Sequence, residues 1–94
     1  MTPKHITIDV SGELLKAVLF PADAGHPAPA PCLILCHGAF EKKENFFEFA
    51  EFLVEKGVAA IALDMPGHGE SGGPRAHLDM DQWVKAIQAV IDYL

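Results

Sequence analysis

Apolar and polar residues alternate at the start of the chain. From Ile6 to Val10 every second residue is apolar, and this period of two predicts a half-buried strand over residues 4–10. The Ser11-Gly12 pair supplies a tight turn, after which residues 13–20 continue as a second strand. Residues 1–20 are therefore expected to form an antiparallel hairpin.

Two further segments are apolar throughout. Cys32–Cys36 and Val58–Leu63 contain no charged residue, as expected of strands that are buried on both faces of a parallel sheet. An amphipathic helix over residues 46–56 is predicted between them, because one side is apolar and the opposite side is acidic. The apolar stripe consists of Phe46, Phe49, Ala50 and Leu53. A strand, a helix and a strand at this spacing form a βαβ unit, in which the two strands run parallel.

The ends of two helices carry sequence signals. Asn45 is expected to cap the first helix with Glu48 as its capping-box partner, and Gly57 is expected to end it. Asp79 is expected to cap a last helix that runs to the end of the sequence. The apolar stripe of that helix consists of Trp83, Val84, Ile87, Val90, Ile91 and Leu94.

The predicted fold class is α/β, with a mixed sheet of four strands and one helix on each face. The 94 residues are expected to form a single, incomplete domain. Its parts are the hairpin of residues 1–20, a connection over residues 21–31, and a strand–helix–strand–loop–helix segment over residues 32–94. The connection holds four prolines, which exclude a helix or a central strand because proline lacks an N–H and fixes φ.

Composition narrows the range of partners. The net charge of −6 argues against nucleic acid, which is bound by clustered lysine and arginine. No apolar stretch approaches the roughly 20 residues that cross a bilayer, and no signal peptide is visible after Met1. Cys32 and Cys36 are about 13 Å apart on one strand, which is too far for a disulfide with each other. We therefore expect buried, reduced thiols and a cytoplasmic location.

A loop that contains histidine follows each of the two parallel strands. The first is His37-Gly38-Ala39-Phe40, and the second is Asp64-Met65-Pro66-Gly67-His68-Gly69-Glu70-Ser71. Ligands of such sheets bind beyond the carboxyl ends of the strands. The two motifs, with the amphipathic helix between them, resemble the amino-terminal portion of the α/β-hydrolases, in the branch of serine esterases, lipases and aminopeptidases. The resemblance implies a strand order of 1-2-4-3, with strands 2 to 4 parallel or nearly so.

The resemblance also implies roles for both loops. Acyl transfer places negative charge on a carbonyl oxygen, which backbone N–H groups stabilise. In α/β-hydrolases one donor comes from the loop after the third strand, here the N–H of Ala39, next to Gly38, where the backbone turns closely. Phe40 is expected to line the acyl pocket and His37 to shape the loop. The second loop is expected to be structural, through Asp64, Gly67, His68, Gly69 and Ser71.

Two other motifs match only formally. Residues 69–73 match G-x-S-x-G, but a nucleophile elbow needs a strand directly before it and a helix directly after it. Ser71 is therefore disfavoured as a nucleophile, and no catalytic residue is expected in this chain. Residues 67–72 match G-x-G-x-x-G, but the flanking prolines disfavour a dinucleotide site, which stays a remote alternative. No two histidines have the spacing of a metal site, so neither a metal nor a cofactor is expected.

The function expected from these features is that of an amino-terminal fragment of a serine hydrolase acting on ester, thioester or amide bonds. The fragment supplies the oxyanion-hole loop and scaffold, and alone it is predicted to be inactive, because the family's catalytic serine, acid and histidine normally follow Leu94. Two alternatives are a non-catalytic module that binds a small ligand and a self-associating structural fragment. The expected partners are a small acyl-type substrate, if a carboxyl-terminal half completes the fold, and a second copy or a complementing chain at the open strand edge.

Overall fold

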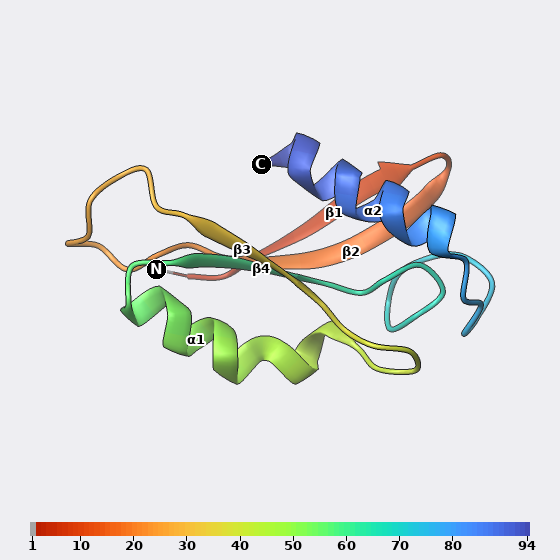
Figure 1. Cartoon of the computed structure of the whole chain (residues 1–94), viewed down its shortest axis with the longest axis horizontal. Helices are drawn as coiled ribbons and strands as arrows, with labels where there is room; N and C mark the ends of the chain where they lie inside the picture. Colours follow the sequence, from red (N-terminus) through yellow and green to blue (C-terminus); the bar gives the residue numbers. More distant parts are fainter. Residues whose placement is uncertain (1) are drawn as a thin grey trace.

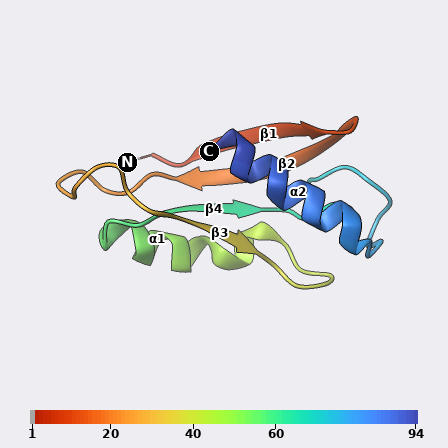
Figure 2. The same cartoon turned by 45° about the horizontal axis from the view of Figure 1, so that its top comes forward.

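The computed structural model describes residues 2–94. Its sheet contains β1 (Lys4–Val10), β2 (Glu13–Phe20), β3 (Cys32–Cys36) and β4 (Ala59–Leu63). Figure 1 shows the strands, and Figure 2 shows them in the order β1-β2-β4-β3, as expected from the sequence. β1 and β2 form the predicted antiparallel hairpin, and β3 and β4 are parallel, with Ile34 opposite Ile61.

The prediction that strands 2 to 4 are parallel is wrong for β2. This strand pairs antiparallel with β4, so that Ala17 lies opposite Leu63 and Phe20 opposite Ala60. The end of β2 therefore lies beside the start of β4, which is also where β3 begins. Residues 21–31 contain no helix and simply turn the chain at that end of the sheet. A parallel arrangement needs a longer crossover along the sheet.

The two-residue turn between β1 and β2 has the backbone conformation that hairpin turns of this length require. Ser11 and Gly12 both have positive φ angles, 53° and 88°, as in the two-residue type I′ turns that match the twist of the flanking strands. The N–H of Gly12 donates to Oδ1 of Asp9 at 2.8 Å. This turn fixes the register that places Val10 opposite Glu13.

The first helix begins differently from the prediction. A single turn of 3₁₀-helix, Lys43–Phe46, precedes α1, Phe47–Glu55. Asn45 lies inside that turn and donates from Nδ2 to Oε1 of Glu41 at 3.2 Å, so it does not cap the helix. The predicted end at Gly57 is confirmed: its φ is 84°, and it accompanies the pair of terminal hydrogen bonds typical of a Schellman motif, Gly57 N–H to Val54 O and Val58 N–H to Leu53 O.

The second helix, α2 (Met80–Tyr93), has the predicted cap. Oδ1 of Asp79 accepts from the N–H of Asp81 at 3.0 Å and of Gln82 at 3.3 Å. α1 covers one face of the sheet and α2 the other, as Figures 1 and 2 show. Side chains alternate along β4, so Ala60 and Ala62 face α1 while Ile61 and Leu63 face α2. Two cores result, and β4 is buried on both faces.

β3 is exposed more than the sequence suggests. Cys36 is exposed, Cys32 is only half-buried and Leu33 retains 46% of its accessible surface, so the expectation of two buried thiols is wrong. The reason is that, within residues 2–94, β3 has a neighbouring strand on one side only. Both thiols are free, and partial burial raises the pKa of each. A reducing compartment stays a prediction.

Candidate functional site

Both histidine loops lie at the same end of the sheet, beyond the carboxyl ends of β3 and β4 (Figure 1). His37 directly follows β3 and is buried. Its Nε2 accepts the N–H of Met65 at 3.0 Å, which means that Nδ1 carries the proton and donates to the carbonyl of Gly38 at 2.7 Å. One imidazole therefore ties the loop after β3 to the loop after β4.

The residues after His37 are raised into solvent. Gly38, Ala39 and Phe40 are all exposed, and the N–H of Glu41 closes a turn onto the carbonyl of Gly38 at 3.3 Å. Among residues 2–94 the N–H groups of Ala39 and Phe40 have no acceptor. Phe40 has a φ of 64°, in the left-handed region that a bulky residue rarely adopts. Strained residues of this kind concentrate at functional sites.

Glycine is required more strictly in the loop after β4 than in the loop after β3. Gly38 has no positive φ, and a Cβ there would meet only the carboxylate at the end of the Glu41 side chain. Gly67 and Gly69 have φ angles of 78° and 51°. A Cβ on Gly67 would overlap the carbonyl of Pro74, and one on Gly69 would overlap the carboxylate of Asp64.

That carboxylate belongs to a buried ion-pair cluster that sequence reasoning missed. Oδ1 of Asp64 accepts the backbone N–H of Lys43 at 2.8 Å, and Oδ2 accepts Nζ of Lys43 at 2.7 Å and the N–H of Glu70 at 2.9 Å. Nζ of Lys43 also contacts the carboxylates of Glu70 at 2.6 Å and Glu44 at 3.0 Å. Lys43 is 2% exposed and Asp64 is fully buried. The cluster fixes the start of the first helix to the loop after β4, residues 64–73, which we call the glycine-rich loop.

The pKa values of the cluster favour the charged forms. Burial alone raises the pKa of Asp64, but the hydrogen bonds from Lys43 Nζ and from two backbone N–H groups more than offset this and hold it below its ordinary value. Burial likewise opposes the charge on Lys43, whose pKa is nevertheless raised by its bonds to Asp64, Glu70 and Glu44. The hydrogen bond from Lys43 lowers the pKa of Glu70.

The hydroxyl of Ser71 is fully occupied by backbone groups. Oγ donates to the carbonyl of Asp64 at 2.5 Å and accepts the N–H of Lys16 at 2.9 Å. Two backbone bonds, Asp64 N–H to Lys16 O and Gly72 N–H to Leu14 O, continue the contact between this loop and β2. Ser71 is 2% exposed, so its oxygen is not presented to a substrate.

Neither formal motif in this loop has the structural context that its chemistry requires. β4 ends at Leu63 and α2 begins at Met80, so Ser71 is on no strand-to-helix elbow. The stretch 67–72 opens no helix either, which removes the dinucleotide alternative. Within residues 2–94 there is no group of three or more His, Cys, Asp or Glu side chains arranged to hold a metal ion.

An aromatic cluster supports the exposed loop from below. The ring centroid of His68 lies 5.3 Å from that of His37, 5.4 Å from that of Trp83 and 6.2 Å from that of Phe40. Nδ1 of His68 is bonded to the carbonyl of Pro66 at 3.0 Å. Nε2 of His68 and Nε1 of Trp83 are buried without a partner among the described residues. The sequence predicted Trp83 only as part of the apolar stripe of the last helix. In the structure Trp83 lies one turn into α2, and its ring packs edge-on against the rings of both His37 and His68.

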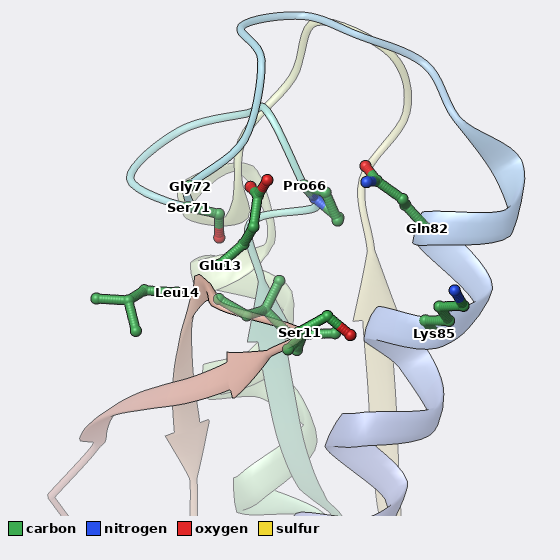
Figure 3. Close-up of a pocket in the computed structure, with 10 residues that line it drawn as sticks. Ser11, Glu13, Leu14, Pro66, Ser71, Gly72, Gln82 and Lys85 are labelled. Atoms are coloured by element: carbon green, nitrogen blue, oxygen red, sulfur yellow. The ribbon is translucent and has the colours of Figure 1, made fainter.

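A cavity of about 100 Å³ lies elsewhere, between the hairpin turn, the glycine-rich loop and α2 (Figure 3). Glu13 extends into this region from the start of β2, and one of its carboxylate oxygens is buried without a partner in the described part of the chain. None of residues 37–40 lines the cavity, so it is separate from the His37 loop. The helices formed by residues 2–94 lack the length and apolar character needed to cross a membrane.

The sequence and the fold both have known relatives. The profile of the family described as serine aminopeptidase, S33, matches residues 27–94. Est1E from Butyrivibrio proteoclasticus, solved with ferulic acid bound, is 34% identical with a TM-score of 0.83, over 94% of this chain and 36% of that one. The monoacylglycerol lipase of Mycolicibacterium smegmatis is 33% identical over 64 residues, which are 67% of this chain and 23% of the lipase.

A third relative also matches most of the chain. The dihydrolipoyllysine-residue acetyltransferase component of the acetoin cleaving system of Pseudomonas putida is 33% identical over 87 residues, 92% of this chain and 22% of that protein. The chain thus spans about a quarter of the length of the curated relatives it matches.

Proposed function

Because this chain belongs to the serine aminopeptidase S33 family of the α/β-hydrolase fold, we propose that it supplies the oxyanion-hole loop and part of the scaffold of a serine hydrolase. The N–H of Ala39 is the proposed donor to the oxyanion, and Phe40 borders the acyl group. The nucleophile, acid and base would come from sequence outside residues 1–94. Ser71 is not among them, since both hydrogen-bonding functions of its hydroxyl are engaged by the backbone.

The observation that carries the proposal is the loop after β3. Its N–H groups at Ala39 and Phe40 are exposed and have no acceptor among residues 2–94, while His37 beneath them is bonded on both ring nitrogens. Donors that are fixed in advance stabilise a developing oxyanion without reorganisation in the reaction. The positive φ of Phe40 is a cost that a mere connecting turn does not require.

The substrate class follows from the relatives and stays coarse. The names of the matched proteins refer to an aminopeptidase family and to a lipase, and one structure contains ferulic acid. We therefore propose an ester, thioester or amide of a small acyl group. The exposed ring of Phe40, 6.2 Å from that of His68, offers one apolar wall.

A first experiment tests the chain alone. The 94-residue protein is expected to show no turnover of short-chain esters and no labelling by a fluorophosphonate probe. Stoichiometric labelling that Ser71→Ala abolishes would contradict the assignment of Ser71 as a structural residue.

A second experiment tests the oxyanion donor. In a chimera, this chain replaces the matching portion of Est1E, so that the nucleophile, acid and base are supplied by the relative. Ala39→Pro removes the N–H, and is expected to lower kcat by about 10²–10³, whereas Ala39→Gly keeps the N–H and is the matched control. An active chimera in which Ala39→Pro has no more effect than Ala39→Gly would reject the proposed donor.

A further inference from the structure

The cavity between the hairpin turn, the glycine-rich loop and α2 has room for a small molecule (Figure 3). Its volume of about 100 Å³ is about three times the roughly 30 Å³ that one water molecule takes up in the liquid. The residues that line it belong to the end of β1, the hairpin turn, the start of β2, the glycine-rich loop and α2. Binding there would therefore be independent of the loop after β3.

The carboxylate of Glu13 is surrounded by backbone at one end of this cavity. Oε2 of Glu13 lies so close to the glycine-rich loop that a Cβ on Gly73 would come within 2.6 Å of it, and one on Gly72 within 3.6 Å. The two glycines thus leave the space that the carboxylate occupies. Oε2 is buried, and no group of residues 2–94 donates a hydrogen bond to it. Because a buried charged acceptor without a donor is costly, this oxygen offers a place for a donor from a ligand.

The opposite wall of the cavity contributes a positive charge. Gln82 and Lys85 lie on the same face of α2, because residues three apart on a helix are neighbours. Figure 3 shows both across the cavity from Glu13. Glu13 and Lys85 are the only charged residues among the described residues that line the cavity. The lining is therefore neutral as a whole, with a negative group on the hairpin side and a positive group on the helix side.

Apolar side chains lie between these two charged groups. They are Val10, Leu14, Leu15 and Pro66. With the volume given above, they leave space for a short aliphatic group and not for an aromatic ring. The cavity thus combines an acceptor for an ammonium group, donors for a carboxylate and an apolar wall of limited size.

We propose that this cavity binds a free α-amino acid with a small aliphatic side chain, such as L-alanine. Its ammonium group donates to Oε2 of Glu13, and its carboxylate accepts from Nζ of Lys85 and from the amide of Gln82. Hydrogen bonds between charged groups are the strong ones. A ligand with only one charge leaves the opposite charge of the cavity without a partner. A zwitterion satisfies both and keeps the site neutral.

Fragments of the ligand test each half of the proposal. Binding to the ¹⁵N-labelled 94-residue chain is followed by NMR chemical shifts at constant pH and ionic strength. L-Alanine is expected to bind with a Kd of about 1 mM, with the largest shifts near Glu13, Gly73 and Lys85. Ethylamine lacks the carboxylate and propionate lacks the ammonium group, so each should bind at least about tenfold more weakly. L-Phenylalanine is too large and should not bind.

Two variants test the charged residues. Glu13→Gln keeps the size of the side chain and removes its negative charge, and Lys85→Met removes the ammonium group but keeps the apolar stem. Each is expected to weaken binding of L-alanine by about tenfold or more. Glu55→Gln and Lys56→Met are the matched controls, because both residues are exposed at the end of α1, on the other face of the sheet. They should change the Kd by less than about twofold.

Three results would overturn the proposal. They are the absence of saturable shifts with L-alanine, equal binding of L-alanine and either fragment, and an equal effect of the variants and their controls. The ligand series uses only the wild-type protein, so it decides the proposal even if a variant fails to fold. The same series in the chimera with Est1E repeats the test within a complete hydrolase, and neither version depends on turnover.

Discussion

The carboxylate of Asp64 binds Lys43 twice, accepting its backbone N–H through one oxygen and its ammonium group through the other. The residues are 21 positions apart: Lys43 begins the 3₁₀ turn before α1, and Asp64 begins the loop after β4. Because both are buried, removing one leaves the other charge without its main partner. The geometry of the glycine-rich loop therefore depends on a lysine outside either recognised motif.

Lys43→Met is expected to lower the free energy of unfolding by about 3–5 kcal/mol, the usual cost of leaving one member of a buried pair alone. Lys42→Met is the matched control, because Lys42 is the preceding residue and is exposed; it should change stability by less than about 0.5 kcal/mol. Chemical unfolding of both variants measures the difference. Equal effects would mean that the pair does not hold the loop.

The pKa of Asp64 predicts a dependence of stability on pH. The folded-state pKa lies below the ordinary value of 3.8, so the stabilisation is present above that value and is lost as the pH falls through the lower, folded pKa. The difference in unfolding free energy between the wild type and Asp64→Asn is therefore expected to stay constant at neutral pH and to shrink as the pH falls below about 5. A difference that stays constant in acid as well would show that Asp64 does not titrate with folding.

Phe40→Gly and Phe40→Ala separate backbone strain from contacts of the ring. Both remove the ring, but only glycine adopts a φ of 64° without strain. We expect Phe40→Gly to be about 1–2 kcal/mol more stable than Phe40→Ala, as measured by thermal melting. Equal stabilities would indicate that the loop relaxes out of the left-handed conformation.

Gly69→Ala is expected to be costly for a second reason besides its φ. Its Cβ would overlap the Asp64 carboxylate, whereas Gly25 also has a positive φ but has open space around it. Gly25→Ala should therefore cost about 1–2 kcal/mol, and Gly69→Ala clearly more. Gly38→Ala should cost less than either, because it displaces only the Glu41 side chain. Urea denaturation of the three variants ranks them; a tolerated Gly69→Ala would contradict the tight fit at Asp64.

Local signals in the sequence predicted most of the fold. Alternation, apolar runs and the Asp79 cap placed every strand and α2 to within a residue or two. The direction of β2 was missed because it depends on where residues 21–31 leave and rejoin the sheet, and composition contains no such information. Asn45 was misassigned because a competing 3₁₀ turn over Lys43–Phe46 takes up the position where a side-chain cap was expected.

The candidate site was only partly predictable. The two histidine loops are recognisable as motifs, and the sheet brings both to one edge. Lys43 was missed because it lies in the charged run Glu41-Lys42-Lys43-Glu44, which resembles a solvated surface until Asp64 is placed beside it. The sequence predicts a role for the ring of Phe40. It does not predict the positive φ of Phe40, because that backbone conformation depends on the folded loop and not on the type of residue.

The bonds between the glycine-rich loop and β2 have a consequence for the order of assembly. Lys16 reaches Ser71 across 55 positions of sequence, a long separation that slows the closing of such contacts. During synthesis the hairpin leaves the ribosome first, and its partner strand β4 follows only after the prolines, β3 and α1. One side of β2 therefore stays unpaired until β4 has been synthesised. The glycine-rich loop takes its final conformation only after β4 has paired with β2 and β3.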